Sequence, residues 1–289
     1  MFYSPLRYPG GKGKLAPLME LLIEKTGHRG GTYVEPFAGG AGIALELLEK
    51  NVVKDIVIND LDKGIYSFWR AMLTDTERFI YDIRNIALTI DEWNNQRAVA
   101  ENCNKYSYAL GFATFYLNRT NRSGIIKGGV IGGMEQNGHW KMNARFNRES
   151  LIKRIAKIAN RKAHIHIYNK DVNSFIHHYL PKYEQNAFVY FDPPYFGKGK
   201  QLYLNFFSFN DHKRIEEMVN RKVNCDWVIT YDDVTAIADI YRNHILKRID
   251  LNYSAATKRK ACEIIIFKRR SMIPTVNQME RRNIFMNLH

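Results

Sequence analysis

The segment Asp192-Pro193-Pro194-Tyr195 closes an apolar run over 187–191 and gathers hydrogen-bond acceptors in one turn. A proline holds φ at about −65° and has no backbone N–H group. The turn therefore offers carbonyl oxygens beside the Asp192 carboxylate. Such acceptors suit an exocyclic amine of a nucleobase, because drawing its hydrogens towards Asp192 and the Pro193 carbonyl localises the nitrogen lone pair and stabilises positive charge developing there. We predict that Asp192, Pro193, Pro194 and Tyr195 are catalytic residues.

Tyr195 adds an aromatic face beside these acceptors. A base inside a duplex is out of reach, so it must flip into such a pocket, where it can stack on Tyr195 while the acceptors hold its amino group. The alternative interpretation of this short motif is a strand exit stiffened by two prolines, with no part in chemistry.

A second turn, Glu35-Pro36-Phe37-Ala38-Gly39-Gly40-Ala41-Gly42, joins a short apolar run to a stretch with helical spacing. Glycine lets a strand turn tightly into a helix and lets a ligand approach the bare backbone. Asp60 ends the next apolar run, 25 positions after Glu35. An acid about 20 positions beyond the glycines accepts hydrogen bonds from ribose hydroxyls in dinucleotide folds. The two features together predict a site for an adenosyl ligand.

Spacing disfavours two other ligands. The glycines of 39–42 do not follow the G-x-G-x-x-G pattern of nicotinamide sites. The segment Tyr8-Pro9-Gly10-Gly11-Lys12-Gly13 is similar to a phosphate loop, but it lacks the Walker spacing and the Ser or Thr after the lysine. Plain turn chemistry remains the alternative for each segment taken singly.

The elements that position these turns alternate between strand and helix. Strands are expected over 33–35, 55–60, 163–168, 187–191, 227–230 and 264–267. This pattern predicts an α/β fold with parallel strands, in which ligands bind at the carboxyl ends of the strands.

The alternation is interrupted over 63–162, which is mainly helical in character. We expect an inserted domain there, with the core formed by 1–62 and 163–289. Residues 118–138 within it are glycine-rich and polar, which favours a hairpin or a mobile loop.

Positive charge is concentrated in the same insertion. The chain carries 43 Lys and Arg against 29 Asp and Glu, a net charge of +14, and residues 119–162 contribute 11 Lys and Arg against 2 Glu. Such an excess favours a polyanion through counterion release, so double-stranded DNA is the expected partner. Arg and Asn suit bidentate contacts with guanine and adenine edges, which makes Asn118, Arg119, Asn121 and Arg122 candidates for base reading. A phosphate contact or a solvated loop is the alternative for each of them.

Further basic residues are expected to contact DNA, mostly at its backbone. They are Lys127, Arg145, Arg148, Lys153, Arg154, Lys157, Lys258 and Arg259.

Other sequence signals are negative. Cys103, Cys225 and Cys262 are far apart and lack metal-ligand spacing, so neither a disulfide framework nor a metal is expected. No stretch approaches the length of about 20 apolar residues that a membrane span needs, and the expected location is the cytoplasm.

Taken in order, these motifs resemble those of the Dam-type, or D12-class, DNA adenine-N6 methyltransferases. Tyr8-Pro9-Gly10-Gly11-Lys12 is similar to the N-terminal cofactor motif of that family, Glu35 to Gly42 to its glycine motif, Asp60 to its ribose-binding acid, and Asp192 to Tyr195 to its catalytic motif. The resemblance covers nearly the whole chain. It implies a Rossmann-like methyltransferase sheet, mostly parallel with an antiparallel strand near the C-terminus, and an insertion that recognises the target sequence.

The resemblance also implies S-adenosylmethionine as cofactor and assigns individual roles. Lys12 would seat the methionine end of the cofactor, Phe37 would contact it, and Tyr231 would line the base pocket. The expected cofactor-binding residues are Tyr8, Gly10, Gly11, Lys12, Glu35, Pro36, Phe37, Gly39, Gly40, Asp60 and Asp192. A cognate restriction endonuclease and a monomer or weak dimer are also expected.

Two alternatives to this function remain open at the level of sequence. Related catalytic turns serve other amines, such as cytosine N4, an RNA base or a glutamine amide. A non-catalytic DNA-binding protein on the same fold would carry degenerate motifs, whereas the motifs here are intact.

Overall fold

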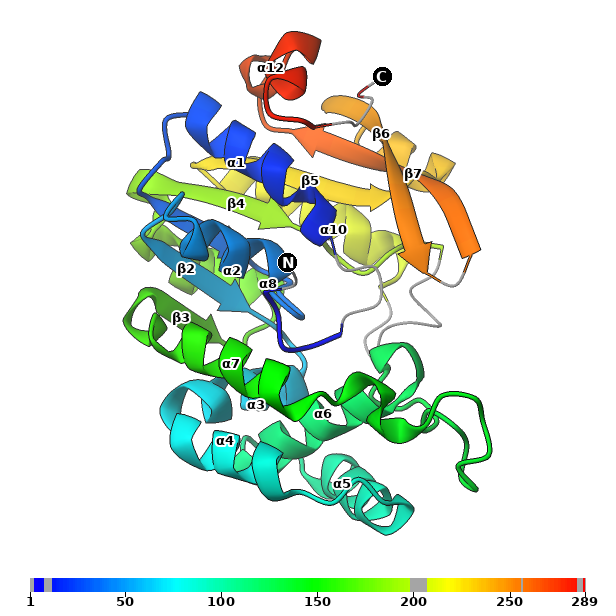
Figure 1. The fold of residues 1–289 in the computed structure, drawn as a ribbon. Helices are drawn as coiled ribbons and strands as arrows, with labels where there is room; N and C mark the ends of the chain where they lie inside the picture. Colours follow the sequence, from blue (N-terminus) through cyan, green and yellow to red (C-terminus); the bar gives the residue numbers. More distant parts are fainter. Residues whose placement is uncertain (1–2, 8–11, 198–206, 256, 285–287, 289) are drawn as a thin grey trace.

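A seven-stranded sheet forms the centre of the computed structural model, which describes residues 3–7, 12–197, 207–255, 257–284 and 288, with only the backbone described over 251–255 and 257–261 (Figure 1). In sheet order the strands are β3 (Ile165–Tyr168), β2 (Asp55–Asn59), β1 (Thr32–Glu35), β4 (Ala187–Phe191), β5 (Asp226–Asp232), β7 (Thr257–Phe267) and β6 (Ile245–Ala255). The five strands from β3 to β5 in this order are parallel to one another. Strand β7 is antiparallel to both β5 and β6. The predicted mostly parallel α/β sheet with an antiparallel strand near the C-terminus is confirmed.

The order of the strands reverses between β1 and β4. From β1 the chain proceeds outwards through β2 and β3, and it then returns to place β4 on the other side of β1. Ligands of open α/β sheets bind at such a switch point, beyond the carboxyl ends of the strands. The glycine turn follows β1 and the Asp192 turn follows β4, so both turns lie at the switch point.

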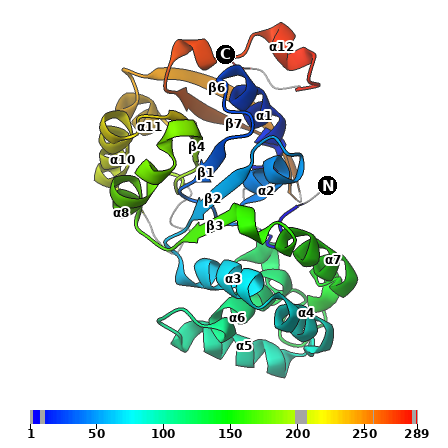
Figure 2. The ribbon, with the colours of Figure 1, turned by 90° about the vertical axis from the view of Figure 1, so that its left-hand side faces the viewer.

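Helices cover both faces of the sheet (Figure 2). Helices α1 (Ala16–Lys25) and α2 (Gly42–Glu49) lie on one face, and α8 (Val172–Ser174), α10 (Phe209–Lys222) and α11 (Thr235–Ile240) lie on the other. In β4, Phe188 and Tyr190 join one hydrophobic cluster, whereas Val189 and Phe191 join the other. Burial on both faces explains why this strand is apolar at every position.

Five α-helices follow β2 and precede β3 in the sequence. They lie beyond the β3 edge of the sheet (Figures 1 and 2). They are α3 (Lys63–Thr74), α4 (Thr76–Asn85), α5 (Ile90–Asn102), α6 (Tyr108–Thr120) and α7 (Arg148–Ala159). Asp62, Thr89, Ser107 and Asn147 cap α3, α5, α6 and α7 with their side chains. Aromatic residues such as Phe68, Phe79 and Phe115 fill the space between helices and belong to the hydrophobic cluster that also covers one face of the sheet.

The predicted hairpin of the 118–138 region is not formed as a strand pair. Among the described residues of this region, a single antiparallel bridge joins Asn121 to Val130, because α6 continues to Thr120 and occupies the first positions of the expected hairpin. The long hairpin of the molecule is instead β6–β7, and α12 (Val276–Glu280) follows it. None of the helices in the described ranges has the length and apolar character needed to cross a membrane.

Candidate active site and DNA-contact surface

The glycine turn and Asp60 form one hydrogen-bonded unit. The Asp60 Oδ2 atom accepts the N–H of Gly39 at 2.8 Å, and Oδ1 accepts the N–H of Asp62 at 2.9 Å. Gly39 has φ of +47°, a left-handed conformation that favours glycine. Burial, followed by the charge of Asp62, raises the pKa of Asp60 to about 7. An acid with this pKa is poised to accept or to lose a proton near neutral pH when a ligand arrives.

Glu35 lies at the end of β1 and is buried, with an exposed fraction of 5%. Its Oε1 atom accepts the N–H of Ala44 in the first turn of α2 at 3.2 Å. A helix N-terminus stabilises a negative charge, but burial dominates and raises the pKa of Glu35 to about 8. Glu35 therefore joins the strand to the helix across the glycine turn.

Lys12 is buried beside the Asp192 turn. Its side chain is 2% exposed, and its Nζ atom lies 2.8 Å from Thr230 Oγ1, 2.6 Å from Glu263 Oε2 and 3.0 Å from Asp192 Oδ1. Burial opposes a charged ammonium, but the two carboxylates outweigh it, so the pKa of Lys12 is raised.

The contact of Lys12 with the methionine end of the cofactor stays a prediction. An ammonium has three N–H donors, and three acceptors already surround it. In this structure Lys12 ties the Asp192 turn to the strands beside it.

Asp192 remains accessible, since 27% of its side chain is exposed. Thr230 donates to its Oδ1 atom at 3.3 Å. Burial raises the pKa of Asp192, Lys12 lowers it, and Glu263 raises it further. The turn beyond it is held by Asp232, whose carboxylate accepts the N–H groups of Phe196 and Gly197 at 3.0 and 2.8 Å.

The ring of Tyr195 is largely enclosed, with an exposed fraction of 8%. Its hydroxyl donates to Glu263 Oε1 at 2.8 Å, and Lys12 Nζ lies 5.0 Å from the ring centroid. Glu263, Thr230 and Tyr190 are site residues that the sequence analysis missed. An acid inside the apolar run Glu263-Ile264-Ile265-Ile266-Phe267 was the available signal, because an acid is seldom buried without a partner.

Tyr231 does not line a base pocket, which corrects that expectation. It is fully buried, its hydroxyl lies 3.2 Å from His212 Nδ1, and its ring packs against Tyr241. Aromatic side chains nearer the switch point come from other segments. Phe37 packs against Phe207, and both Phe196 and Phe207 pack against His212.

Asn118 and Asn121 cannot read bases in this structure, because both amides are buried and satisfied within the chain. Asn118 accepts the N–H of Arg7 at 2.7 Å and donates to the carbonyls of Arg7 and Gly124 at 2.7 and 2.9 Å. Asn121 accepts from Trp93 Nε1 at 2.6 Å and donates to two carbonyls of the following loop. Both residues hold the N-terminal segment and the 122–130 loop on α6.

Arg119 belongs to a cluster of four arginines, Arg7, Arg119, Arg145 and Arg154, which we call the arginine cluster. Burial lowers the pKa of Arg119, and Arg154, Arg7 and Arg145 lower it further, to about 9. Arg154 donates to the carbonyl of Ser4 at 2.7 Å, whereas the Arg119 Nε atom is buried without a hydrogen-bond partner. In the described part of the chain no carboxylate forms an ion pair with these four side chains, so the cluster is suited to an anion.

The remaining DNA-binding candidates differ in their surroundings. Arg122, Lys127, Lys153 and the already named Arg145 are exposed. Arg148 instead donates to carbonyls at the end of α4, and Lys157 pairs with Glu49, so both serve the fold. Lys258 and Arg259 lie in β7 opposite Ser254 and Tyr253. Tyr8, Gly10 and Gly11 lie outside the described residues.

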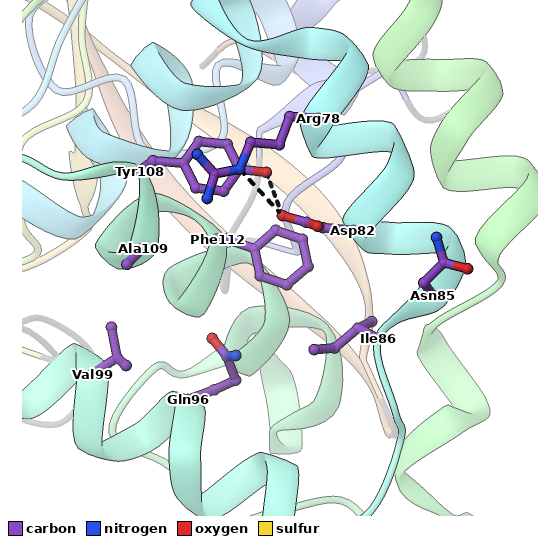
Figure 3. Close-up of a pocket in the computed structure, with 9 residues that line it drawn as sticks. All are labelled: Arg78, Asp82, Asn85, Ile86, Gln96, Val99, Tyr108, Ala109 and Phe112. Carbon is purple, nitrogen blue, oxygen red and sulfur yellow. Dashed lines mark hydrogen bonds and ion pairs between the residues drawn. The ribbon is translucent and has the colours of Figure 1, made fainter.

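A hollow of about 380 Å³ lies between α4, α5 and α6 (Figure 3). Arg78 lies over the Tyr108 ring on its wall, and Asp82 accepts the Tyr108 hydroxyl at 2.6 Å. None of the expected site residues lines this hollow. Over the described ranges, no group of three His, Cys, Asp or Glu side chains is arranged to hold a metal ion.

The sheet order, the glycine turn joined to Asp60 and the accessible Asp192 turn together define a methyltransferase with a Rossmann-like fold. The chain belongs to the D12 class N6 adenine-specific DNA methyltransferases, whose family model matches residues 8–255. The protein is thus a methyltransferase that acts on DNA, and S-adenosylmethionine is its methyl donor.

Individual relatives are more distant. The chain is 25% identical to the Type II methyltransferase M.MjaIII of Methanocaldococcus jannaschii over 227 residues, which are 73% of this chain and 76% of that protein. Among solved structures it is similar to the rRNA methyltransferase aviRa from Streptomyces viridochromogenes, with a TM-score of 0.41 and 12% identity over 92% of this chain and 88% of that chain. Protein LPL1258 from Legionella pneumophila has a TM-score of 0.36 and 12% identity, over 94% of this chain and 88% of that chain. At these TM-scores neither structure bears on the function.

Proposed function

We propose that this protein is a site-specific enzyme that methylates the N6 amino group of an adenine flipped out of a short double-stranded DNA sequence. One observation supports this above all. The accessible Asp192 turn follows β4, and the Asp60–Gly39 unit follows the neighbouring strands β2 and β1, at the switch point of the sheet. One turn can therefore hold the acceptor amine while the other holds the donor.

The residues present fit the donor. In our proposal Asp60 accepts the ribose hydroxyls, the backbone at Gly39 and Gly40 admits the ligand, and Glu35, Pro36 and Phe37 complete the cofactor site. The methyl group carried on the sulfonium of S-adenosylmethionine is the electrophile. The Asp60 carboxylate, which accepts the N–H of the left-handed Gly39, is the feature of this chain that supports the assignment.

The acceptor amine is activated by the Asp192 turn. The Asp192 carboxylate and the Pro193 carbonyl accept the two N6 hydrogens, which localises the lone pair on nitrogen for attack on the methyl group. Positive charge develops on N6 as the new N–C bond forms and the methyl–sulfur bond of the donor breaks, with S-adenosylhomocysteine as the leaving group, and preorganised acceptors stabilise this charge. The surplus proton then leaves N6, and Asp192 is the carboxylate placed to take it. Tyr195 closes the pocket on the base.

Incubation with labelled S-adenosylmethionine and unmethylated duplex DNA, followed by digestion to nucleosides, tests the proposal. We expect the label on N6-methyldeoxyadenosine. Label on cytosine, on RNA in preference to DNA, or on protein alone would contradict it, and these outcomes correspond to the other amine targets. Binding of DNA without any transfer would support a non-catalytic DNA-binding protein instead.

Residues 63–162 act as the target-recognition domain in this proposal, with residues 1–62 and 163–289 as the catalytic core. The exposed Arg122, Lys127 and Arg145 contact DNA, and Lys258 and Arg259 approach it from the β6–β7 hairpin. The arginine cluster holds a backbone phosphate, because a group of cations without a carboxylate partner is stabilised when an anion enters.

Two substitutions separate phosphate binding from base reading. Arg119→Gln is expected to weaken binding equally for all DNA sequences and to reduce the slope of log K against log salt by about one, because one phosphate contact is lost. Arg122→Ala is expected to relax sequence preference instead. Fluorescence anisotropy on cognate and scrambled duplexes over a salt series measures both effects, and an unchanged salt slope for Arg119→Gln would remove the phosphate assignment.

Affinity for S-adenosylmethionine should fall as pH drops below about 7. The pKa of Asp60 is raised to about 7, so its carboxyl group is protonated below that pH in the free protein. A protonated acid accepts ribose hydrogen bonds poorly, and deprotonating it costs about tenfold in affinity per pH unit. Isothermal titration calorimetry across about pH 5.5 to 8.5 tests this. The Asp60→Asn variant should bind more weakly and without this pH dependence; if it keeps the dependence, another group is responsible.

We further propose that the enzyme works in the cytoplasm as a monomer or weak dimer, together with a restriction endonuclease of the same specificity. The Type II name of the relative M.MjaIII supports this partner. Sedimentation analysis tests the oligomeric state. Methylation mapping of DNA from cells that express the protein identifies the sequence, which must then resist the proposed endonuclease.

A further inference from the structure

Glu263 is a charged residue in the interior of the antiparallel strand β7. Its exposed fraction is 2%, and it is followed by Ile264, Ile265, Ile266 and Phe267, all fully buried. Burying a carboxylate in such surroundings is costly unless it is paired and hydrogen-bonded. A carboxylate at this position therefore needs partners that compensate for the free-energy cost of burying its charge.

The partners of Glu263 come from the two ends of the active site. One oxygen accepts from Lys12 Nζ at 2.6 Å, and the other accepts from the Tyr195 hydroxyl at 2.8 Å. Lys12 also contacts Asp192 Oδ1 at 3.0 Å. One carboxylate thus connects the N-terminal motif, the catalytic turn and the last strand pair of the sheet.

We propose that Glu263 is a positioning residue for methyl transfer: it neutralises Lys12 and anchors Tyr195, so that the negative charge of Asp192 remains available to the acceptor amine. The inference rests on the proposed function of the Asp192 turn.

The charges of Lys12, Glu263 and Asp192 explain why Asp192 alone would not leave a net negative charge in the site. Lys12 carries one positive charge, and Glu263 and Asp192 carry one negative charge each. With Glu263 present the group retains a net negative charge, which can stabilise positive charge developing on N6. With Glu263 neutral, Lys12 and Asp192 form a closed ion pair, and Asp192 becomes a weaker acceptor.

Other titratable groups interact electrostatically with Asp192. The charge of Asp192 also acts on Glu35 and Tyr33 of β1, Tyr190 of β4 and Tyr231 of β5. Burial raises the pKa of Tyr33, Tyr190 and Tyr231 well above 10, so these three stay neutral over the working range. Glu35 has a pKa of about 8 and is present in every variant considered below. It therefore does not account for differences between their pH profiles.

The Glu263→Gln variant tests the proposal, since it keeps the shape of the side chain and removes its charge. We expect kcat for adenine methylation to fall roughly ten- to a hundredfold, with KM for DNA changed by less than about threefold. Because Glu263 raises the pKa of Asp192, its removal should move the acid limb of the kcat/KM profile to lower pH. A merely structural defect would lower activity without moving this limb.

Glu216→Gln is the matched control. Glu216 is a carboxylate with 16% of its side chain exposed, and like Glu263 it has an ionisable partner, His244 Nε2 at 2.6 Å. It belongs to α10 and does not contact the site. This variant should keep the wild-type profile. Glu263→Asp retains the charge and should recover part of the lost kcat with the acid limb at its wild-type position.

The outcomes separate this inference from the proposed function. If the wild-type protein does not methylate adenine, the proposed function fails. If it does, but Glu263→Gln retains wild-type kcat and pH profile, only the role of Glu263 is contradicted. If circular dichroism shows that Glu263→Gln does not fold, the Tyr195→Phe variant tests the proposal, because it removes the hydroxyl that donates to Glu263. We expect its kcat to be lower by roughly threefold to tenfold. An unchanged kcat overturns the proposal.

Discussion

Replacing Asp192 with alanine is expected to lower kcat for methyl transfer by roughly a thousandfold or more, while the affinity for S-adenosylmethionine changes by less than about threefold. The substitution removes a carboxylate acceptor that is 27% exposed and thus able to meet a substrate. Binding of the donor should persist, because the Asp60–Gly39 unit belongs to other strands and does not contact Asp192. Methyl transfer under single-turnover conditions and calorimetry with the cofactor measure the two effects separately.

The fold should survive this substitution because Lys12 keeps a carboxylate partner in Glu263, at 2.6 Å. Asp239→Ala, at an exposed position of α11, is the matched control and should retain full activity. A turnover of Asp192→Ala near that of the wild-type protein would overturn the catalytic assignment, and a loss of both cofactor binding and folding would show that the residue acts mainly on the structure.

The Lys12→Met variant is expected to lose about 3–5 kcal/mol of folding free energy near neutral pH, since removing one partner of a buried ion pair leaves the other charge uncompensated. Here two carboxylates, Asp192 and Glu263, would be left facing each other across the space of the ammonium. Chemical denaturation monitored by circular dichroism measures the loss. Lys54→Met, at an exposed position, is the matched control and should be nearly neutral.

The destabilisation should depend on pH in a defined direction. Without Lys12 the native carboxyl groups bind protons more tightly than those of the unfolded chain, which titrate at about pH 4. The penalty is therefore complete above the native pKa values and shrinks as pH falls, because protonation removes the buried charge. A penalty that is the same at about pH 5 and about pH 8 would show that Lys12 acts by packing and not by charge.

Motifs whose backbone conformation depends on the residue types within them could be predicted from the sequence. Gly39 marks a left-handed turn and the two prolines mark a strand exit, since these residue types constrain the backbone wherever they occur. The alternation of apolar runs with helical stretches predicted the parallel sheet, because burial on both faces makes a strand apolar at every position, as in β4. The order of the motifs was enough to indicate the family that the whole-chain comparison shows.

Which polar side chains are buried and paired within the chain was decided by tertiary structure alone. Asn118 has an amide side chain of the kind that reads bases. In the structure this amide is buried and accepts the N–H of Arg7, 111 positions away. Glu263 drew no prediction from its sequence context, but it pairs with Lys12, 251 positions away. A sequence pattern reports the preferences of neighbouring residues, whereas burial and ion pairing depend on segments that meet only after the sheet has formed. The chemistry of this protein could therefore be inferred from its turns, but the network that supports Asp192 required the folded chain.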